Sequence, residues 1–153
     1  KIKTPSWSLE HSSKLSTYDT NTVISAPLSE DGNPAKIFEL LLLEEINNFR
    51  SEDITNEIIE VFNREKIKKL ISEDKINFII GNYTRFSKLV MPKKKLSIVK
   101  EDEDDNRILE CAETANVDYI ISGDEHLLKL RNYKSIKIVS SKEFFGIYLK
   151  YIK

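Results

Sequence analysis

The last third of this chain alternates short apolar runs with segments of helical periodicity. Each run is short enough for a buried strand, and apolar residues then recur every three or four positions. This alternation is typical of βαβ units, in which helices connect parallel strands of one sheet. The expected elements are strand 96–99, helix 105–116, strand 118–122, helix 125–130, strand 136–140 and a last helix from Ser141.

The first two thirds of the chain continue the pattern with weaker signals. A Gly-Asn turn and Pro34 precede a strongly apolar stretch, and Ser51 is suited to cap a helix. The expected elements here are strand 15–19, helix 34–46, an extended segment at 47–51, helix 52–63 and a long helix over 73–90. We therefore expect an α/β fold, a three-layer α/β/α arrangement with a central, parallel, twisted sheet flanked by helices.

Length and composition limit the remaining possibilities. With 153 residues, 40% of them hydrophobic, the chain can bury its own core, so we expect one domain at 15–153 after a tail of unknown role at 1–14. The single cysteine excludes an intramolecular disulfide framework and fits a reducing compartment. No apolar run long enough to span a bilayer and no signal-peptide pattern is present. We expect no membrane partner and a cytoplasmic location.

Charge is balanced overall but unevenly placed along the chain. The 24 basic and 25 acidic residues give a net charge of -1, so the global positive field common among nucleic-acid-binding proteins is missing. Acids fill 101–105, lysines fill 93–95, and basic residues crowd 64–69. These runs could be ordinary solvated faces. They also suit an enzyme in which a group of acidic residues holds a metal and basic residues around it bind a phosphate backbone.

Four acids far apart in sequence carry the strongest functional signal: Asp19, Glu57, Asp105 and Asp124. Three of them stand where a strand-like run gives way to a helical pattern, and the carboxyl ends of parallel strands meet at one edge of a sheet. Carboxylates gathered there would repel one another unless a hard divalent cation lay between them. The pattern therefore predicts a metal-dependent phosphodiester hydrolase.

Each acid also has a structural interpretation. Carboxylates at a helix start cap backbone N–H groups, and Ser122 with Glu125 fits a capping box, which would make Asp124 an ordinary early helix acid. Asp19 is the hardest to explain structurally, because a charged residue interrupts a segment that should be buried. Asn21 would lie on the same side of an extended chain, where it could orient Asp19 or a water.

Three segments are informative together: DTNTVISA at 19–26, GNPAKIFEL at 32–40 and DEDDNRILECAETANVDYIISGDEHLLKL at 102–130. They resemble the PIN-domain nucleases, in particular the VapC-like toxins of prokaryotic toxin–antitoxin pairs, and the resemblance covers residues 15–145. It implies a PIN-like fold in which the four acids hold catalytic Mg²⁺ or Mn²⁺. By the same resemblance, Asn21, Asn106 and Ser122 would orient those ligands or water.

The resemblance implies an Mg²⁺- or Mn²⁺-dependent endoribonuclease that hydrolyses RNA and acts as a toxin blocked by a cognate antitoxin protein. It also implies a possible homodimer, for which helices 34–46 and 52–63 could supply apolar faces. The alternative is a PIN fold that has lost its metal and serves as an RNA- or protein-binding scaffold. A haloacid-dehalogenase-type phosphatase is excluded because Asn21 and Leu128 stand where that chemistry needs aspartates.

Two ligand assignments stay open on the sequence. Asp102 and Asp104 flank the third ligand, and helical periodicity puts Asp102 on the same face as Asp105. The helical glutamate is Glu57 or Glu60, one turn apart. His126 begins a helix, where we expect it to face solvent rather than to bind metal.

Overall fold

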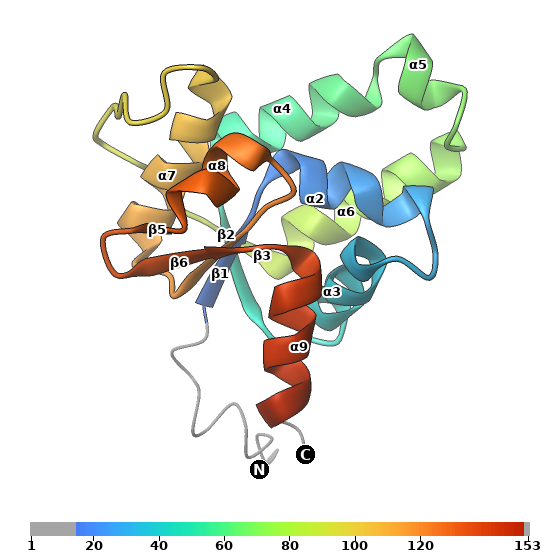
Figure 1. The fold of residues 1–153 in the computed structure, drawn as a ribbon. Coiled ribbons are helices and arrows are strands. Elements are labelled where there is room, and N and C mark those ends of the chain that lie inside the picture. The colour runs from blue at the N-terminus through green and yellow to red at the C-terminus, as the bar shows by residue number, and fades with distance from the viewer. Residues whose placement is uncertain (1–14, 152–153) are drawn as a thin grey trace.

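The computed structural model describes residues 15–151, and within them six strands form one sheet in the order β3-β2-β1-β4-β6-β5 (Figure 1). All neighbouring strands run parallel except β5 and β6, which form an antiparallel pair at one edge. The predicted α/β fold with a central parallel sheet is confirmed, and the antiparallel edge was not expected. The strands are β1 (Leu15–Tyr18), β2 (Asn47–Arg50), β3 (Ser87–Leu89), β4 (Tyr119–Ile121), β5 (Asn132–Tyr133) and β6 (Ile136–Val139).

Helices flank the sheet on both sides. In Figure 1, α7 lies to the left of the central strands and α3 and α9 lie to the right, and α7 contacts β1, β2 and β4. The helices are α2 (Thr20–Ser25), α3 (Asn33–Leu42), α4 (Glu52–Phe62), α5 (Glu65–Lys68), α6 (Glu73–Phe86), α7 (Glu103–Ala115), α8 (Glu125–Leu130) and α9 (Ser141–Tyr151), with a 3₁₀ turn, η1 (Ala26–Leu28). Within residues 15–151, none of them combines the length and apolarity that crossing a bilayer requires. The tail predicted at 1–14 falls outside the described residues.

Strand β1 is buried on both faces although its sequence is polar. The hydroxyl of Tyr18 donates to the carbonyl of Ile37 in α3 at 2.7 Å. The neighbouring Thr17 points the other way, and its Oγ1 lies 3.9 Å from Sγ of Cys111 in α7. A central parallel strand needs cover on both faces, and these contacts show that α3 and α7 provide it.

The buried side-chain amide of Asn48 links three neighbouring strands, β1, β2 and β3. Oδ1 of Asn48 in β2 accepts hydrogen bonds from Oγ of Ser16 at 3.2 Å and from the backbone N of Tyr18 at 3.0 Å. Its Nδ2 donates to Oγ of Ser87 in β3 at 2.9 Å. These hydrogen bonds give the polar side chains of the three strands partners inside the protein, which allows them to be buried.

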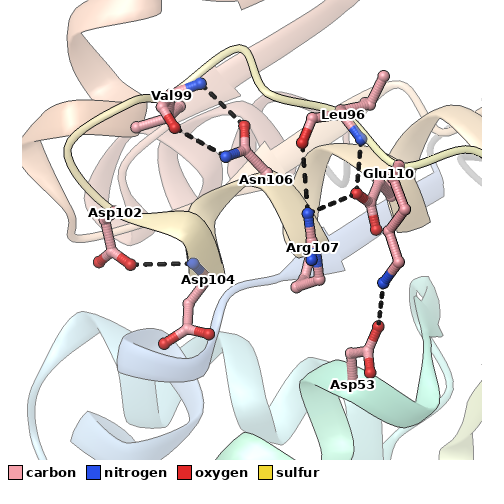
Figure 2. A network of polar contacts seen from close by, with 9 residues as sticks. Asp53, Leu96, Val99, Asp102, Asp104, Asn106, Arg107 and Glu110 are labelled. Carbon is pink, nitrogen blue, oxygen red and sulfur yellow. Dashed lines mark hydrogen bonds and ion pairs between the residues drawn. The ribbon is translucent and has the colours of Figure 1, made fainter.

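The prediction of a strand at 96–99 is wrong. This segment belongs to a loop that crosses α7, and its backbone bonds to side chains of that helix rather than to a strand (Figure 2). The backbone N of Leu96 donates to Oε2 of Glu110 at 2.8 Å. Oδ1 of Asn106 accepts from the backbone N of Val99 at 2.8 Å, and its Nδ2 donates to the Val99 carbonyl at 2.7 Å. Side chains of α7 thus take the place of a strand partner.

Three predicted helix boundaries also differ. The helix expected over 73–90 ends at Phe86, because buried Ser87 joins Asn48 and starts edge strand β3. Helix α3 ends at Leu42 rather than near residue 46. Helix α7 begins earlier than residue 105, because Asp102 caps it by accepting from the backbone N of Asp104.

Candidate functional site

The carboxyl ends of β1 and β4 open into a pocket of about 250 Å³. All four predicted ligand acids line it, each from a different element: Asp19 follows β1, Asp124 follows β4, Asp105 lies on α7 and Glu57 lies on α4. Asn21, Asp102 and Asp104 line it as well. The structure therefore brings together acids that are separated by more than half of the chain.

Asp19 is held rigidly at the floor of the pocket. As the N-cap of α2, it accepts from the backbone N of Thr22 at 2.8 Å through Oδ1, and from Oγ of Ser122 at 2.5 Å through Oδ2. Only 3% of the residue is exposed. Burial raises its pKa, the bonds from Ser122 and Thr22 lower it, and the nearby charge of Asp124 raises it.

Asp124 caps α8 and is tied to the same serine. Its Oδ1 accepts from the backbone N of His126 at 2.7 Å and of Leu127 at 3.4 Å. Its own backbone N donates to Oγ of Ser122 at 2.9 Å. The capping box expected from Ser122 and Glu125 is therefore wrong, because Asp124 itself is the N-cap and Ser122 connects the two aspartates.

Asp105, in the first turn of α7, is the most unusual group in the pocket. The residue is 6% exposed, and its buried Oδ2 has no hydrogen-bond partner among residues 15–151. Burial first, and then the charges of Asp124 and Asp102, raise its pKa to about 8. A buried carboxylate oxygen without a donor is costly in a folded protein, so its persistence here indicates a position shaped for a bound positive charge.

Glu57, rather than Glu60, faces the pocket. Oγ1 of Thr20 donates to Oε1 of Glu57, which is half-buried. Burial is the main cause that raises the pKa of Glu57 to about 7, and the neighbouring Asp104 and Asp102 raise it further. Glu60 is exposed on the next turn, where its carboxylate lies 2.8 Å from Nη2 of Arg64.

The two acids beside Asp105 have different positions. Asp102 caps α7 through a 3.0 Å bond from the backbone N of Asp104 (Figure 2). Asp104 is exposed, lines the pocket and interacts electrostatically with Glu57. Asp105 alone of the three is buried, which makes it the best placed of them to hold an ion against Asp19 and Asp124.

The two asparagines do not contact the carboxylates in the way the sequence suggested. Asn21 is exposed and lies in the first turn of α2, so the extended chain expected at Asp19 and Asn21 is wrong. Both polar atoms of the Asn106 side chain bond to the backbone of Val99 (Figure 2). Asn106 therefore anchors the loop over α7, next to Asp105.

The sequence reasoning missed Thr20, which lines the pocket, and its expectation that His126 faces solvent overlooked the place of this residue beside Asp124. Thr20 follows Asp19 directly and bonds Glu57. Nδ1 of His126 lies 3.6 Å from Oδ1 of Asp124, and ligand atoms of Asp105, Asp124 and His126 all lie within 4.8 Å of one another. A histidine two residues after a capping aspartate is the signal that could have pointed to this position.

The donor set suits a hard divalent cation. Carboxylate oxygens dominate the pocket, and oxygen ligands are those that Mg²⁺ and Mn²⁺ prefer in proteins. Oδ2 of Asp105, which has no hydrogen-bond partner among the described residues, offers one ligand atom. The carboxylates of Asp19 and Asp124 are already oriented by hydrogen bonds from Ser122 and from the start of α8. The residues present therefore fit such an ion.

Comparisons with known proteins agree with this geometry. A family model described as PIN domain matches residues 17–126, which include all four acids. An uncharacterized protein of Methanocaldococcus jannaschii is 32% identical over 143 residues, covering 88% of this chain and 91% of that protein.

Proposed function

Because the chain belongs to the PIN-domain family, we propose that it is a metal-dependent endoribonuclease that hydrolyses RNA phosphodiester bonds. PIN domains are generally nucleases, and they typically use divalent metals. The proposal narrows this class to RNA as substrate and to Mg²⁺ or Mn²⁺ as cofactor.

The observation that carries the proposal is the state of Asp105. Its Oδ2 is buried and has no hydrogen-bond partner in the described part of the chain, and its pKa is raised by burial and by three other aspartates. If Asp105 served only to cap a helix, its carboxylate oxygens would accept hydrogen bonds from backbone N–H groups. If its position were an ordinary part of the core, an apolar residue would occupy it. A carboxylate kept unpaired among Asp124 and Asp19 is explained by a cation that binds there.

Each of the four acids has a role in this proposal. When bound, a divalent cation supplies positive charge for the phosphate and a water that loses its proton near neutral pH. Asp19, Asp105 and Asp124 hold the ion, and Ser122 bonds both the carboxylate of Asp19 and the backbone N of Asp124. Glu57 enters the pocket from α4, and Thr20, which follows Asp19, orients it.

We extend the proposal to a biological role from the resemblance to VapC-like toxins. The chain would then be a toxin that stops growth by cutting cellular RNA, and a cognate antitoxin would cover the acidic pocket. A homodimer would follow from the same resemblance. Expression in a bacterial host should arrest growth, whereas the Asp19→Asn variant should not.

The decisive experiment is cleavage of labelled single-stranded RNA by the purified chain. We expect cleavage with Mn²⁺, none with EDTA, and a loss of at least about 100-fold in rate for Asp19→Asn and Asp124→Asn. The exposed Asp31, away from the pocket, gives a matched control, and Asp31→Asn should keep full activity. Equal behaviour of wild type and pocket variants would favour the inactive scaffold instead.

A thermal-shift titration makes the same test without catalysis. Mn²⁺ should raise the melting temperature of the wild type, because an ion that binds only the folded state stabilises it. The shift should shrink in Asp105→Asn and persist in Asp31→Asn. A scaffold without a metal site should show no shift that depends on the divalent ion.

A further inference from the structure

Arg64 is the one basic residue among those that line the acidic pocket in the described part of the chain. The other charged residues that line it are carboxylates, and RNA brings further negative charge. A bound cation offsets part of that repulsion at the cleaved bond only. The neighbouring phosphates of the strand need a different positive group.

The position of Arg64 suits that task. It is the N-cap residue of α5, one turn after Glu60 of α4, and it lines the same pocket as Glu57 and Asp104. Its pKa is raised first by the bond to Glu60 and then by the charges of Glu60, Glu57 and Asp104.

The present partner of Arg64 is easily exchanged. Nη2 of Arg64 lies 2.8 Å from Oε1 of Glu60, and the two side chains are 60% and 65% exposed. Exposed ion pairs at this spacing on a helix are weak, because solvent screens them. A phosphate offers the planar guanidinium a two-pronged contact that is stronger than this single bond.

We propose that Arg64 binds a phosphate of the RNA strand adjacent to the phosphodiester that is cleaved, giving up its bond to Glu60 when it does so. The proposal rests on the function proposed above, because it places the cleaved bond at the aspartates. Lys66, Lys68 and Lys69 follow Arg64 in the chain and are all exposed. They continue the basic charge of Arg64 along α5, the short helix that follows α4 in Figure 1.

Binding of a short fluorescein-labelled single-stranded RNA, measured by anisotropy with Ca²⁺ in place of Mn²⁺, tests the contact. Arg64→Gln should weaken binding about tenfold at low salt. Arg64→Lys should weaken it less, because lysine keeps the positive charge but lacks the two parallel N–H donors of the guanidinium. The slope of log affinity against log salt should fall by about 0.7, the value for one phosphate contact on a single strand. Lys150→Gln removes one charge from the far end of α9 and should change neither quantity.

A double variant separates the contact from a simple charge effect. Arg64→Gln leaves Glu60 unpaired, and the freed carboxylate could repel RNA by itself. If repulsion were the whole cause, Glu60→Gln combined with Arg64→Gln would restore wild-type binding and overturn the proposal. If Arg64 contacts the RNA, the double variant should stay about as weak as Arg64→Gln.

Methylphosphonate substitution locates the contacted phosphate. RNAs with one neutral methylphosphonate at successive positions should show one position, next to the cleaved bond, at which wild type loses affinity and Arg64→Gln does not. Loss at every position in both proteins, or no binding by the wild type, would overturn the proposal. Failure of the nuclease function has a different signature, in which wild type binds RNA through Arg64 but never cuts it with Mn²⁺.

Discussion

The hydroxyl of Ser122 donates to Oδ2 of Asp19 over 2.5 Å, although the two residues are 103 positions apart in the chain. Oγ of Ser122 itself accepts from the backbone N of Asp124 at 2.9 Å. A single buried hydroxyl therefore links the carboxylate of Asp19 to the backbone of Asp124, two residues that follow different strands. Ligand geometry at a metal site depends on supports of this kind.

Replacement of this hydroxyl should separate metal affinity from stability. Ser122→Ala removes a donor from a buried carboxylate, so we expect unfolding to become easier by about 1–3 kcal/mol and Mn²⁺ affinity to fall about tenfold or more. Calorimetric titration and thermal unfolding measure the two effects. Ser72→Ala is the matched control, because it removes the N-cap of α6 at comparable cost but leaves the pocket intact. Equal Mn²⁺ affinity in both variants would contradict the role given to Ser122.

The choice between the two glutamates of α4 can be tested by metal binding. Glu57 is half-buried beside Thr20, whereas Glu60 is exposed and paired with Arg64. We expect Glu57→Gln to lower Mn²⁺ affinity about tenfold and Glu60→Gln to leave it unchanged within error. The reverse result would assign the metal ligand to Glu60 and would require α4 to turn from its present orientation.

The raised pKa of Asp105 predicts a pH-dependent stability in the absence of metal. The pKa rises from an ordinary 3.8 to about 8 through burial and neighbouring charges, so the folded state holds this proton more tightly than the unfolded chain does. The resulting stabilisation is complete below the unfolded value and is lost as the pH rises through about 8. Glu57, with its pKa raised to about 7, acts in the same direction.

The measurement is chemical denaturation of the EDTA-treated protein across this pH range. Wild type should lose stability as the pH rises from 4 to 8, and Asp105→Asn should lose less, ending about 1–3 kcal/mol more stable than wild type at the upper end. Subtracting the two curves removes the contributions of other groups. Saturating Mn²⁺ should reverse the order, because only wild type binds the ion fully. A wild-type curve parallel to that of Asp105→Asn would refute this account of Asp105.

The positions of Asp19 and Asp124 could be predicted from sequence because both residues follow strands. Each comes after a strand-like run, polar before Asp19 and apolar before Asp124, and parallel strands bring their carboxyl ends to one edge. The neighbours of these acids could not be predicted in the same way. The contact of Thr20 with Glu57 and the place of His126 beside Asp124 depend on how two short helices begin, which periodicity does not describe.

The loop at 96–99 shows the opposite difficulty. Its sequence, LSIV, has the composition of a strand, and the prediction of a strand there followed from that pattern. What decides its conformation lies elsewhere in the chain, in the side chains of Asn106 and Glu110 on α7. A local pattern cannot report a backbone partner supplied by the side chains of another element.

The same loop gives a last prediction about how the pocket is kept in shape. The paired bonds between Asn106 and the backbone of Val99 close the loop just before Asp102, the N-cap of α7 (Figure 2). Asn106→Ala would leave both backbone groups of Val99 without partners, and each unpaired buried group costs about 1–3 kcal/mol. Because the strain falls on the loop, we expect amide hydrogen exchange to speed up over residues 96–102 more than in β1 or β4.

Asn82 on α6 supplies the control, because its Nδ2 also donates to a backbone carbonyl, that of Phe78, outside the loop. Asn82→Ala should leave exchange at 96–102 and Mn²⁺ affinity unchanged. In Asn106→Ala, Mn²⁺ affinity should fall only as far as the start of α7, which carries Asp105, becomes less ordered. Because a bound ion would hold Asp105 in place, added Mn²⁺ should partly restore slow amide exchange at 96–102. Slow exchange at 96–102 in Asn106→Ala without metal would mean that Glu110 and Arg107 hold the loop through Leu96 alone.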